Sequence, residues 1–236
     1  MQLLKEAQVA LARLVRDVNN SIRARVVLLP ANSAGDNIIF HAEGGDVVLP
    51  LLRQQKDGEE CLSLSDFVKP CGTDYVGAFA VTAGRGIEEI ISGYQQTDDF
   101  KALLYQSLSD RLAEAAAELL HARVRREVWG YAPDERIDRQ RALRAQYRGI
   151  RPAAGYPSLP DQSAIFVIEK IVGFTNVGIA VTPNGAMSPA SSVSGLMIAH
   201  PASHYFMIGA IAPDQRRDYA ARCGITEEEL SKWLPK

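Results

Sequence analysis

The chain has 236 residues, of which 47% are hydrophobic and 23% are charged, a composition typical of a globular protein. Its net charge of −2 argues against a general polyanion binder, so no nucleic-acid partner is expected. The first residues lack the apolar core of a signal peptide, and no stretch approaches the ~20 apolar residues of a membrane span. We therefore expect a cytoplasmic protein that has no membrane partner.

The N-terminal part of the chain predicts one helix followed by several short strands. Leu4, Ala7, Leu11, Leu14 and Val18 recur at helical spacing, so residues 1–24 are expected to carry an amphipathic helix. Runs rich in β-branched and aromatic residues then predict strands at 25–30, 37–41, 46–50 and 75–82. The second and third strands are separated by a short glycine-containing turn that suits a hairpin.

The remainder of the chain alternates helices and strands without a regular rhythm. We expect helices at about 98–128, 138–147 and 163–172, strands at 177–182, 192–200 and 204–211, and two small helices at the end. Thr226 and Glu229 have the spacing of a capping box at the last helix. Residues 151–160 contain three prolines and a glycine, so they are expected to form an irregular loop.

These elements predict an α+β fold with a mostly antiparallel sheet and flanking helices. The alternative, a doubly wound parallel sheet, needs a repeated strand–helix–strand order that the chain does not show. No repeat, low-complexity stretch or linker divides the sequence. We therefore expect a single domain over residues 1–236.

Several motifs that invite a catalytic or cofactor interpretation are incomplete. Gly84 and Gly86 follow a strand, but the rest of a dinucleotide-binding fingerprint is missing, so a plain turn is favoured. His200 and His204 are four residues apart, but no third metal ligand is nearby. The three cysteines fit no metal or nucleophile motif and are expected to be reduced thiols. We predict neither a metal site nor catalytic residues.

A basic segment lies between Arg123 and Arg151, where nine arginines stand against four acidic residues. One interpretation is a solvated helix face, and the other is a docking surface for an acidic protein. Nucleic acid is disfavoured because no aromatic side chains for base stacking are interleaved with the arginines.

A polar stripe on the long predicted helix is the more informative feature. It is formed by residues three or four apart: Arg111, Glu114, Glu118, His121 and Arg125. Such a stripe is ordinarily solvated. The loop at 151–156 changes this interpretation, because a guanidinium beside a rigid Pro/Gly turn suits bidentate capture of a carboxylate. An acidic side chain and an arginine that converge from two elements suit the zwitterion of an amino acid.

The loop sequence GIRPAAGYP at 149–157 resembles the signature loop of the activation domain of cobalamin-dependent methionine synthase, usually read as RPAPGYP. Further motifs follow the pattern of this family in order from about residue 26: Pro30-Ala-Asn-Ser33, Leu52-Arg-Gln-Gln55, Asp66-Phe-Val68, Asp74–Thr82, Asp110–Glu114, Trp129–Pro133, Ser192–Gly195, His200-Pro201, Tyr205-Phe206, Asp214-Gln215 and Asp218-Tyr-Ala220.

The resemblance implies a twisted, mostly antiparallel α+β fold that curves around a shallow ligand groove. It also implies a function in methionine biosynthesis, namely S-adenosylmethionine binding and the reductive methylation that reactivates cob(II)alamin. The electron donor would be flavodoxin or a similar reductase. Cobalt is the nucleophile in that reaction, so the resemblance gives this chain no acid, base or nucleophile and no complete active site.

The resemblance also carries ligand contacts over to this sequence. Arg151 would bind the methionyl carboxylate, with Glu114 as its acidic counterpart on the long helix. Backbone and ring contacts would come from Ala153, Gly155 and Tyr156, and a strand would supply Tyr205 and Phe206. The remaining acid and histidine of the polar stripe, Glu118 and His121, are expected to be solvated.

The sequence departs from the family in three places. The family's longer N-terminal segment contributes an aspartate to the ligand, and residues 1–24 replace that segment here. Pro183 and Asn184 stand where the family has an acid and a hydroxyl, and no Asp-x-His-x-x-Gly cobalamin-binding motif exists in the chain. We therefore expect cobalamin only through a partner, a corrinoid protein or a methionine synthase that lacks this domain, on which the chain acts in trans. The alternative is a module that has lost S-adenosylmethionine and only docks on or caps a corrinoid protein.

Overall fold

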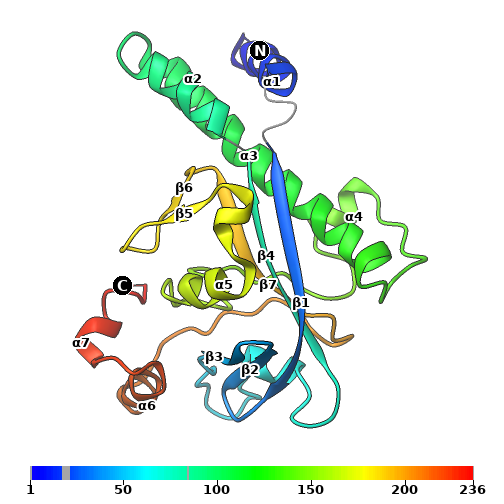
Figure 1. Ribbon diagram of the computed structural model, residues 1–236, viewed down its shortest axis with the longest axis vertical. Helices are drawn as coiled ribbons and strands as arrows, with labels where there is room; N and C mark the ends of the chain where they lie inside the picture. Colours follow the sequence, from blue (N-terminus) through cyan, green and yellow to red (C-terminus); the bar gives the residue numbers. More distant parts are fainter. Residues whose placement is uncertain (1, 18–21, 84, 236) are drawn as a thin grey trace. The chain divides into compact units, whose positions relative to one another are not determined.

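The computed structural model describes residues 2–17, 22–83 and 85–235. The helices and strands, labelled in Figure 1, are in chain order α1 (Gln2–Asp17), β1 (Arg23–Ser33), β2 (Asn37–Ala42), β3 (Gly45–Pro50), β4 (Tyr75–Thr82), α2 (Arg85–Gln95), α3 (Asp99–Arg123), α4 (Arg139–Leu143), α5 (Ala164–Val172), β5 (Ala180–Val181), β6 (Met187–Ser188), β7 (Ser192–Met197), α6 (Pro213–Cys223) and α7 (Glu227–Leu230). A π-helical turn, Val124–Val128, continues α3.

Contacts within the chain divide it into two compact units. Unit 1 contains residues 1–25, 80–122 and 173–193, and unit 2 contains residues 26–79, 123–172 and 194–236. Unit 1 therefore includes α1, α2 and α3, whereas unit 2 includes the β2–β3 hairpin and the four short helices α4 to α7. The expectation of a single domain over the whole chain stays a prediction.

The main sheet has five strands in the order β3-β2-β1-β4-β7. β2 pairs antiparallel with both of its neighbours, and the β2–β3 register joins Ala42 to Gly45 across the predicted hairpin turn. Buried and exposed side chains alternate along β3, as they do when one face of a strand is covered. The predicted α+β class with a mostly antiparallel sheet is confirmed.

Strand β4 is buried along nearly its whole length. Its third residue is Gly77, where the neighbouring strands leave no room for a side chain. A Cβ atom on Gly77 would lie 3.0 Å from Leu28 Cδ2 and 3.1 Å from Met197 Cβ. These contacts come from the two neighbouring strands in the sheet, β1 and β7. Glycine at this position therefore lets the side chains of both neighbours close over β4.

The core of unit 2 is completed by helices that pack on the hairpin. α5 and α6 both contact β3, and α6 also contacts α7. The guanidinium of Arg222 on α6 donates to the backbone oxygens of Asp36 (2.8 Å) and Leu51 (3.0 Å). Thr226 Oγ1 accepts from Glu229 N at 3.1 Å, which confirms the predicted side-chain cap of α7.

The core of unit 1 joins α1 to α2 and α3. Its buried members are Ala10, Leu14, Ala83, Ile87, Ile91, Ala102, Tyr105 and Ala113. The predicted N-terminal helix is present as α1, although Val18 lies outside the described residues. Gly84 also lies outside them, and Gly86 belongs to the first turn of α2. Within the described ranges, no helix is both long enough and apolar enough to cross a membrane.

Helix α3 buries a different face from the one that its leucines predict. Leu104, Leu108 and Leu112 are partly buried, but Phe100 and Leu119 are exposed, Leu119 to 62%. The fully buried residues of α3 are Ala102, Tyr105, Ser109, Ala113, Ala117 and His121. Most of them are small, and they recur at every fourth position from 105 to 121. Small residues let neighbouring backbone approach closely, and this outweighs the larger apolar surface of the leucines.

Three predicted elements are wrong in type or length. Of the strand expected at 177–182, only Ala180–Val181 is a strand, because a 3-10 turn ends at Val177 and Gly178 has a left-handed backbone. Residues 204–211 were expected to form a strand, but they form an irregular segment whose amides bond to loop atoms rather than to a strand ladder. The predicted helix at 138–147 is helical only over Arg139–Leu143. Asp138 caps that helix by accepting from Arg141 N at 2.8 Å, and the chain then turns at Ala145, which has a φ of 49°.

A bidentate ion pair fixes the turn that follows β3 in unit 2. The guanidinium of Arg53 donates to both carboxylate oxygens of Asp66, at 2.7 and 2.6 Å. Asp66 also accepts from Ser63 N at 2.8 Å. Burial by itself raises the pKa of Asp66, but the hydrogen bonds from Arg53 and Ser63 outweigh it, so that pKa lies below its ordinary value.

We expect Asp66→Asn to lower the free energy of unfolding by about 1–2 kcal/mol at pH 7, because it removes a charge-assisted pair that is partly screened by solvent. A carboxyl whose pKa falls on folding stabilises the protein above its unfolded pKa of about 3.9, and this contribution is lost as the pH falls through the folded value. Urea unfolding at pH 7 and pH 3 should therefore show a difference between variant and wild type that shrinks in acid.

Glu59→Gln is the control for this measurement. It breaks an exposed pair between Lys56 and Glu59, for which a change of less than about 0.5 kcal/mol is expected. An Asp66→Asn effect as small as that of the control would show that the Arg53–Asp66 pair does not stabilise the turn.

Candidate functional site

The loop that contains the predicted ligand residues lies against strand β7 in unit 2. Ile150 and Ile198 exchange two backbone hydrogen bonds, at 3.0 and 2.9 Å, and Leu196 N donates to Pro152 O at 2.8 Å. Isolated bridges pair Ile150 with Ile198 and Ala153 with Gly195. The sheet therefore fixes the path of the loop on both sides of Arg151, although the prolines exclude a regular strand.

Gly195 permits this close approach between the loop and β7. A Cβ atom at position 195 would lie 2.3 Å from Pro152 O and 2.9 Å from Ala153 Cα, distances that no side chain tolerates. Ala153 itself is buried at the bridge. Its backbone is therefore part of the supporting contact, and any residue other than glycine at position 195 would push the loop away from the sheet.

Arg151 and Tyr205, both predicted site residues, are in direct contact. Arg151 N donates to Tyr205 Oη at 2.9 Å across 54 positions of sequence. Tyr205 is 44% exposed, and its hydroxyl bonds to the backbone of the loop. Tyr205 lies in the irregular 204–211 segment and not on the strand that was expected.

Phe206 is tied to the same loop through Ser158. Phe206 N donates to Ser158 Oγ at 3.1 Å, and that hydroxyl donates in turn to Phe206 O. The Phe206 ring is only partly buried and makes edge contacts with the rings of Phe67 and His204. The two neighbouring residues 205 and 206 thus contact opposite ends of the loop.

Gly155 and Tyr156 form the tip of the loop. Gly155 has a φ of +82°, a conformation that favours glycine, and a Cβ atom there would meet Gln162 Oε1. Tyr156 N donates to Ala153 O at 3.2 Å, so the tip is a tight turn. The Tyr156 side chain is 56% exposed and leaves an aromatic face accessible at the tip.

Glu114 lies on α3 in unit 1, whereas the other predicted ligand residues lie in unit 2. Its side chain is partly buried. Two other members of the predicted polar stripe are not solvated as expected: His121 and Arg125 are buried, at 0% and 1% exposure. Glu118 is partly buried as well. The expectation that His121 is an ordinary solvated residue is therefore wrong, and two of the five residues of the stripe are buried.

Among the described residues, no cluster of three or more His, Cys, Asp and Glu side chains has the arrangement of a metal site. All three cysteines are free of disulfide bonds. Burial raises the pKa of the Cys223 thiol to about 11, so that thiol stays protonated at neutral pH.

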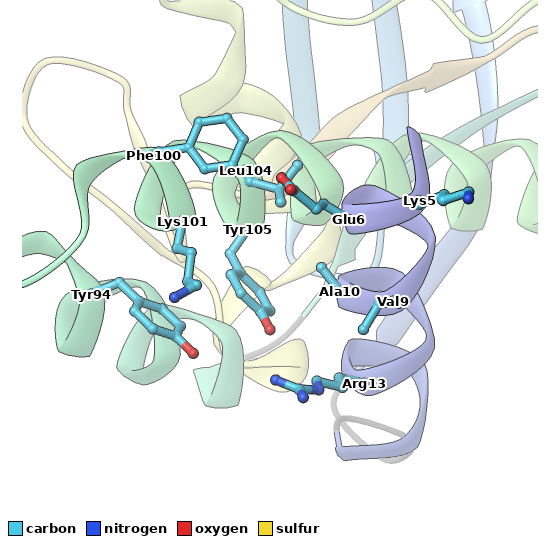
Figure 2. Close-up of a pocket in the computed structure, with 10 residues that line it drawn as sticks. All are labelled: Lys5, Glu6, Val9, Ala10, Arg13, Tyr94, Phe100, Lys101, Leu104 and Tyr105. Atoms are coloured by element: carbon cyan, nitrogen blue, oxygen red, sulfur yellow. The ribbon is translucent and has the colours of Figure 1, made fainter. Parts of the chain in front are cut away.

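A separate cavity of about 470 Å³ lies in unit 1 (Figure 2). Its walls come from α1, the end of α2 and the first turns of α3, and most of the surface is apolar. The stacked rings of Tyr94 and Tyr105 lie 5.4 Å apart at one side. None of the predicted ligand residues lines this cavity, so it is distinct from the Arg151 loop.

The chain belongs to the family described as vitamin B12 dependent methionine synthase, activation domain, whose sequence profile matches residues 1–224. The match includes the N-terminal helix, for which no family motif was recognised in the sequence. The fold is similar to that of the MetH reactivation domain, seen in a crystal structure bound to AdoHcy. The two are 38% identical, with a TM-score of 0.91 over 98% of this chain and 75% of the other.

Three supporting residues of the loop were not predicted as part of the site. Ser158 and Gly195 hold the loop, although both stand within or beside recognised family motifs. Glu135 pairs with the buried Arg125 and accepts from Arg148 N just before the loop, but in the sequence it was counted only as one of the acidic residues of the basic segment. A turn separates Arg125 from Glu135, so no helical spacing predicts that they form a pair.

We expect Tyr205→Phe to loosen the loop without unfolding the protein, because it removes the oxygen that accepts from Arg151 N. Loss of one hydrogen bond with a net contribution of about 1 kcal/mol should make hydrogen exchange at the Arg151 amide roughly fivefold faster. NMR-detected exchange measures this rate directly. Tyr75→Phe, which removes a hydroxyl from an exposed ring on β4, should leave it unchanged. Equal exchange rates in wild type and Tyr205→Phe would show that this hydrogen bond does not hold the loop.

Proposed function

We propose that this chain binds S-adenosylmethionine and supports the reductive methylation of cob(II)alamin in methionine synthase or a related corrinoid protein, on which it acts in trans. Its membership of the activation-domain family supports the proposal. So does the 38% identity to a reactivation domain that was crystallised with AdoHcy, the demethylated form of S-adenosylmethionine. The proposal depends most on one observation, the hydrogen bond that joins Arg151 to Tyr205.

The residues of the loop fit such a ligand chemically. The Arg151 guanidinium is suited to the methionyl carboxylate. The assignment of Glu114 as its acidic counterpart stays a prediction. The faces of Tyr156 and Tyr205 are suited to the flat and apolar parts of the ligand. The sulfonium supplies the methyl group, and the task of this chain is to hold that group still and oriented.

The corrinoid is proposed to come from a partner, because the 236 residues contain no Asp-x-His-x-x-Gly motif. The competing function is a module that docks on or caps a corrinoid protein without S-adenosylmethionine. The Pro183–Asn184 pair favours that alternative, since it replaces an acid and a hydroxyl of the family pattern. Ligand binding by the isolated chain distinguishes the two functions.

We expect isothermal titration of the chain with S-adenosylmethionine to show saturable binding. Arg151→Ala should weaken this binding by at least about two orders of magnitude, because it removes a bidentate charged contact. Arg144→Ala, which removes an exposed arginine from the same unit, is the matched control and should bind like wild type. Unchanged affinity in Arg151→Ala would overturn the assignment of the ligand site, and no binding by wild type would leave the docking function.

The electron donor is proposed to be flavodoxin or a similar acidic reductase, which docks on the basic segment 123–151. Three exposed arginines of this segment, Arg136, Arg141 and Arg148, line a shallow cavity of about 590 Å³ in unit 2. Glu135 is the only acidic residue of that lining. A surface of this kind attracts an acidic protein at long range.

Association with flavodoxin should weaken by about tenfold or more between low salt and about 0.3 M salt, because exposed charges are screened over that range. Arg141→Glu should slow association, measured by surface plasmon resonance, whereas Arg217→Glu on α6 should have a smaller effect. Binding that is insensitive to both salt and Arg141→Glu would reject this docking surface.

A further inference from the structure

Arg125 is a buried cation directly behind the ligand loop, in the π-helical turn that continues α3. Its Nε donates to Glu135 Oε2 at 2.6 Å. Its guanidinium also lies over the ring of Tyr147, with the central carbon 4.0 Å from the ring centroid. Both neighbours are in unit 2, on the segment that leads from the long helix into the loop.

The carboxylate of Glu135 extends this contact to the backbone of the loop. Its second oxygen, Oε1, accepts from Arg148 N at 3.3 Å. The Glu135 side chain is 12% exposed, so solvent competes little for either oxygen. One carboxylate therefore connects the buried guanidinium to the residue three positions before Arg151.

Arg148 and Gly149, which precede the loop, have little freedom. Arg148 donates from its guanidinium to Tyr131 O (3.0 Å) and to Ala199 O (3.2 Å). The next residue, Gly149, has a φ of +83°, and a Cβ atom there would lie 2.5 Å from Tyr131 Oη and 2.7 Å from Ile198 O. A shift of the Arg148 backbone should therefore also shift the backbone of Arg151, because Gly149 has little room to change its conformation between them.

We propose that Arg125 and Glu135 are a positioning pair for the ligand site: they fix the backbone of residues 148–151 and through it the direction of the Arg151 guanidinium. This inference rests on the proposed function, because it concerns how the same loop binds S-adenosylmethionine. Arg125 and Glu135 contact Tyr147 and Arg148, just before the loop, and the proposed ligand contacts come from Arg151 and its neighbours.

The chemistry of the pair argues for positioning over bulk stability. Burying an ion pair removes two charges from water, and a well-packed apolar pair of equal volume stabilises a fold at least as well. A carboxylate with two directional acceptor sites instead fixes the orientation of two donors, Arg125 Nε and Arg148 N. A lysine at position 125 would keep the charge but lose the planar fork and the stacking on Tyr147.

The test compares Arg125→Lys with Arg222→Lys in the full chain. Arg222 is the control, because it is a partly buried arginine of unit 2 whose guanidinium also bonds within the fold, but at α6 and the β2–β3 hairpin. S-adenosylmethionine affinity and stoichiometry are measured by isothermal titration well below both melting temperatures. The ¹⁵N–¹H signals of residues 148–151 report the loop backbone.

We expect both variants to melt at lower temperature, but only Arg125→Lys to bind about tenfold more weakly, at unchanged stoichiometry and with shifted signals for Arg148, Gly149 and Arg151. Affinity within about twofold of wild type would overturn the proposal, and so would equal weakening by Arg222→Lys. The unchanged stoichiometry separates a misplaced loop from a partly unfolded sample.

Glu135→Gln keeps the test decisive if Arg125→Lys does not fold. It preserves the size of the side chain but removes the charge that pairs with Arg125 and weakens the acceptor for Arg148 N. It should also weaken binding by about tenfold, and an unchanged affinity would overturn the proposal. Wild-type protein that binds no S-adenosylmethionine would instead overturn the proposed function, and the positioning role with it.

Discussion

The close backbone contact between the Arg151 loop and strand β7 is the constraint on which the candidate site depends. The loop contains three prolines within ten residues, which exclude a regular strand. It obtains hydrogen bonds from β7, from the 204–211 segment and from tight turns of its own. Gly195 makes the approach sterically possible. Because a strand of the sheet carries the loop, Arg151 is presented from a rigid base, as a binding residue requires.

Much of the fold could be predicted from the sequence because it follows local periodicity. The β2–β3 hairpin, β4, the long helix and α5 have patterns of their own, and the irregular loop is forced by its prolines. The 204–211 run has the same β-rich composition as a strand, but Tyr205, Phe206 and Ile208 all bond to the Arg151 loop. Composition cannot distinguish a strand from an extended segment that is held by another irregular segment.

The buried face of α3 shows a second limit of sequence patterns. Leucines at helical spacing predict a buried stripe, yet close packing here selects alanine and serine, whose small size allows neighbouring backbone to approach. The polar residues His121 and Arg125 then continue this buried face. Their burial depends on partners distant in sequence or separated by a turn, such as Glu135, and no helical periodicity encodes such partners. The candidate site residues were chosen from family motifs, and the supporting contacts of Gly195, Ser158 and Glu135 became visible only in the structure.

The proposed function accounts for the division of roles within unit 2. In that function the methyl group goes to a nucleophile held elsewhere, so the site needs orientation and does not need a proton donor or acceptor. The described groups near the loop are of that kind: an arginine, tyrosine rings and backbone amides fixed by a glycine contact. Orientation in turn depends on what lies behind the loop, and there the chain places a buried ion pair instead of an apolar contact. An apolar contact stabilises many arrangements almost equally, whereas a carboxylate with two donors of fixed direction favours one.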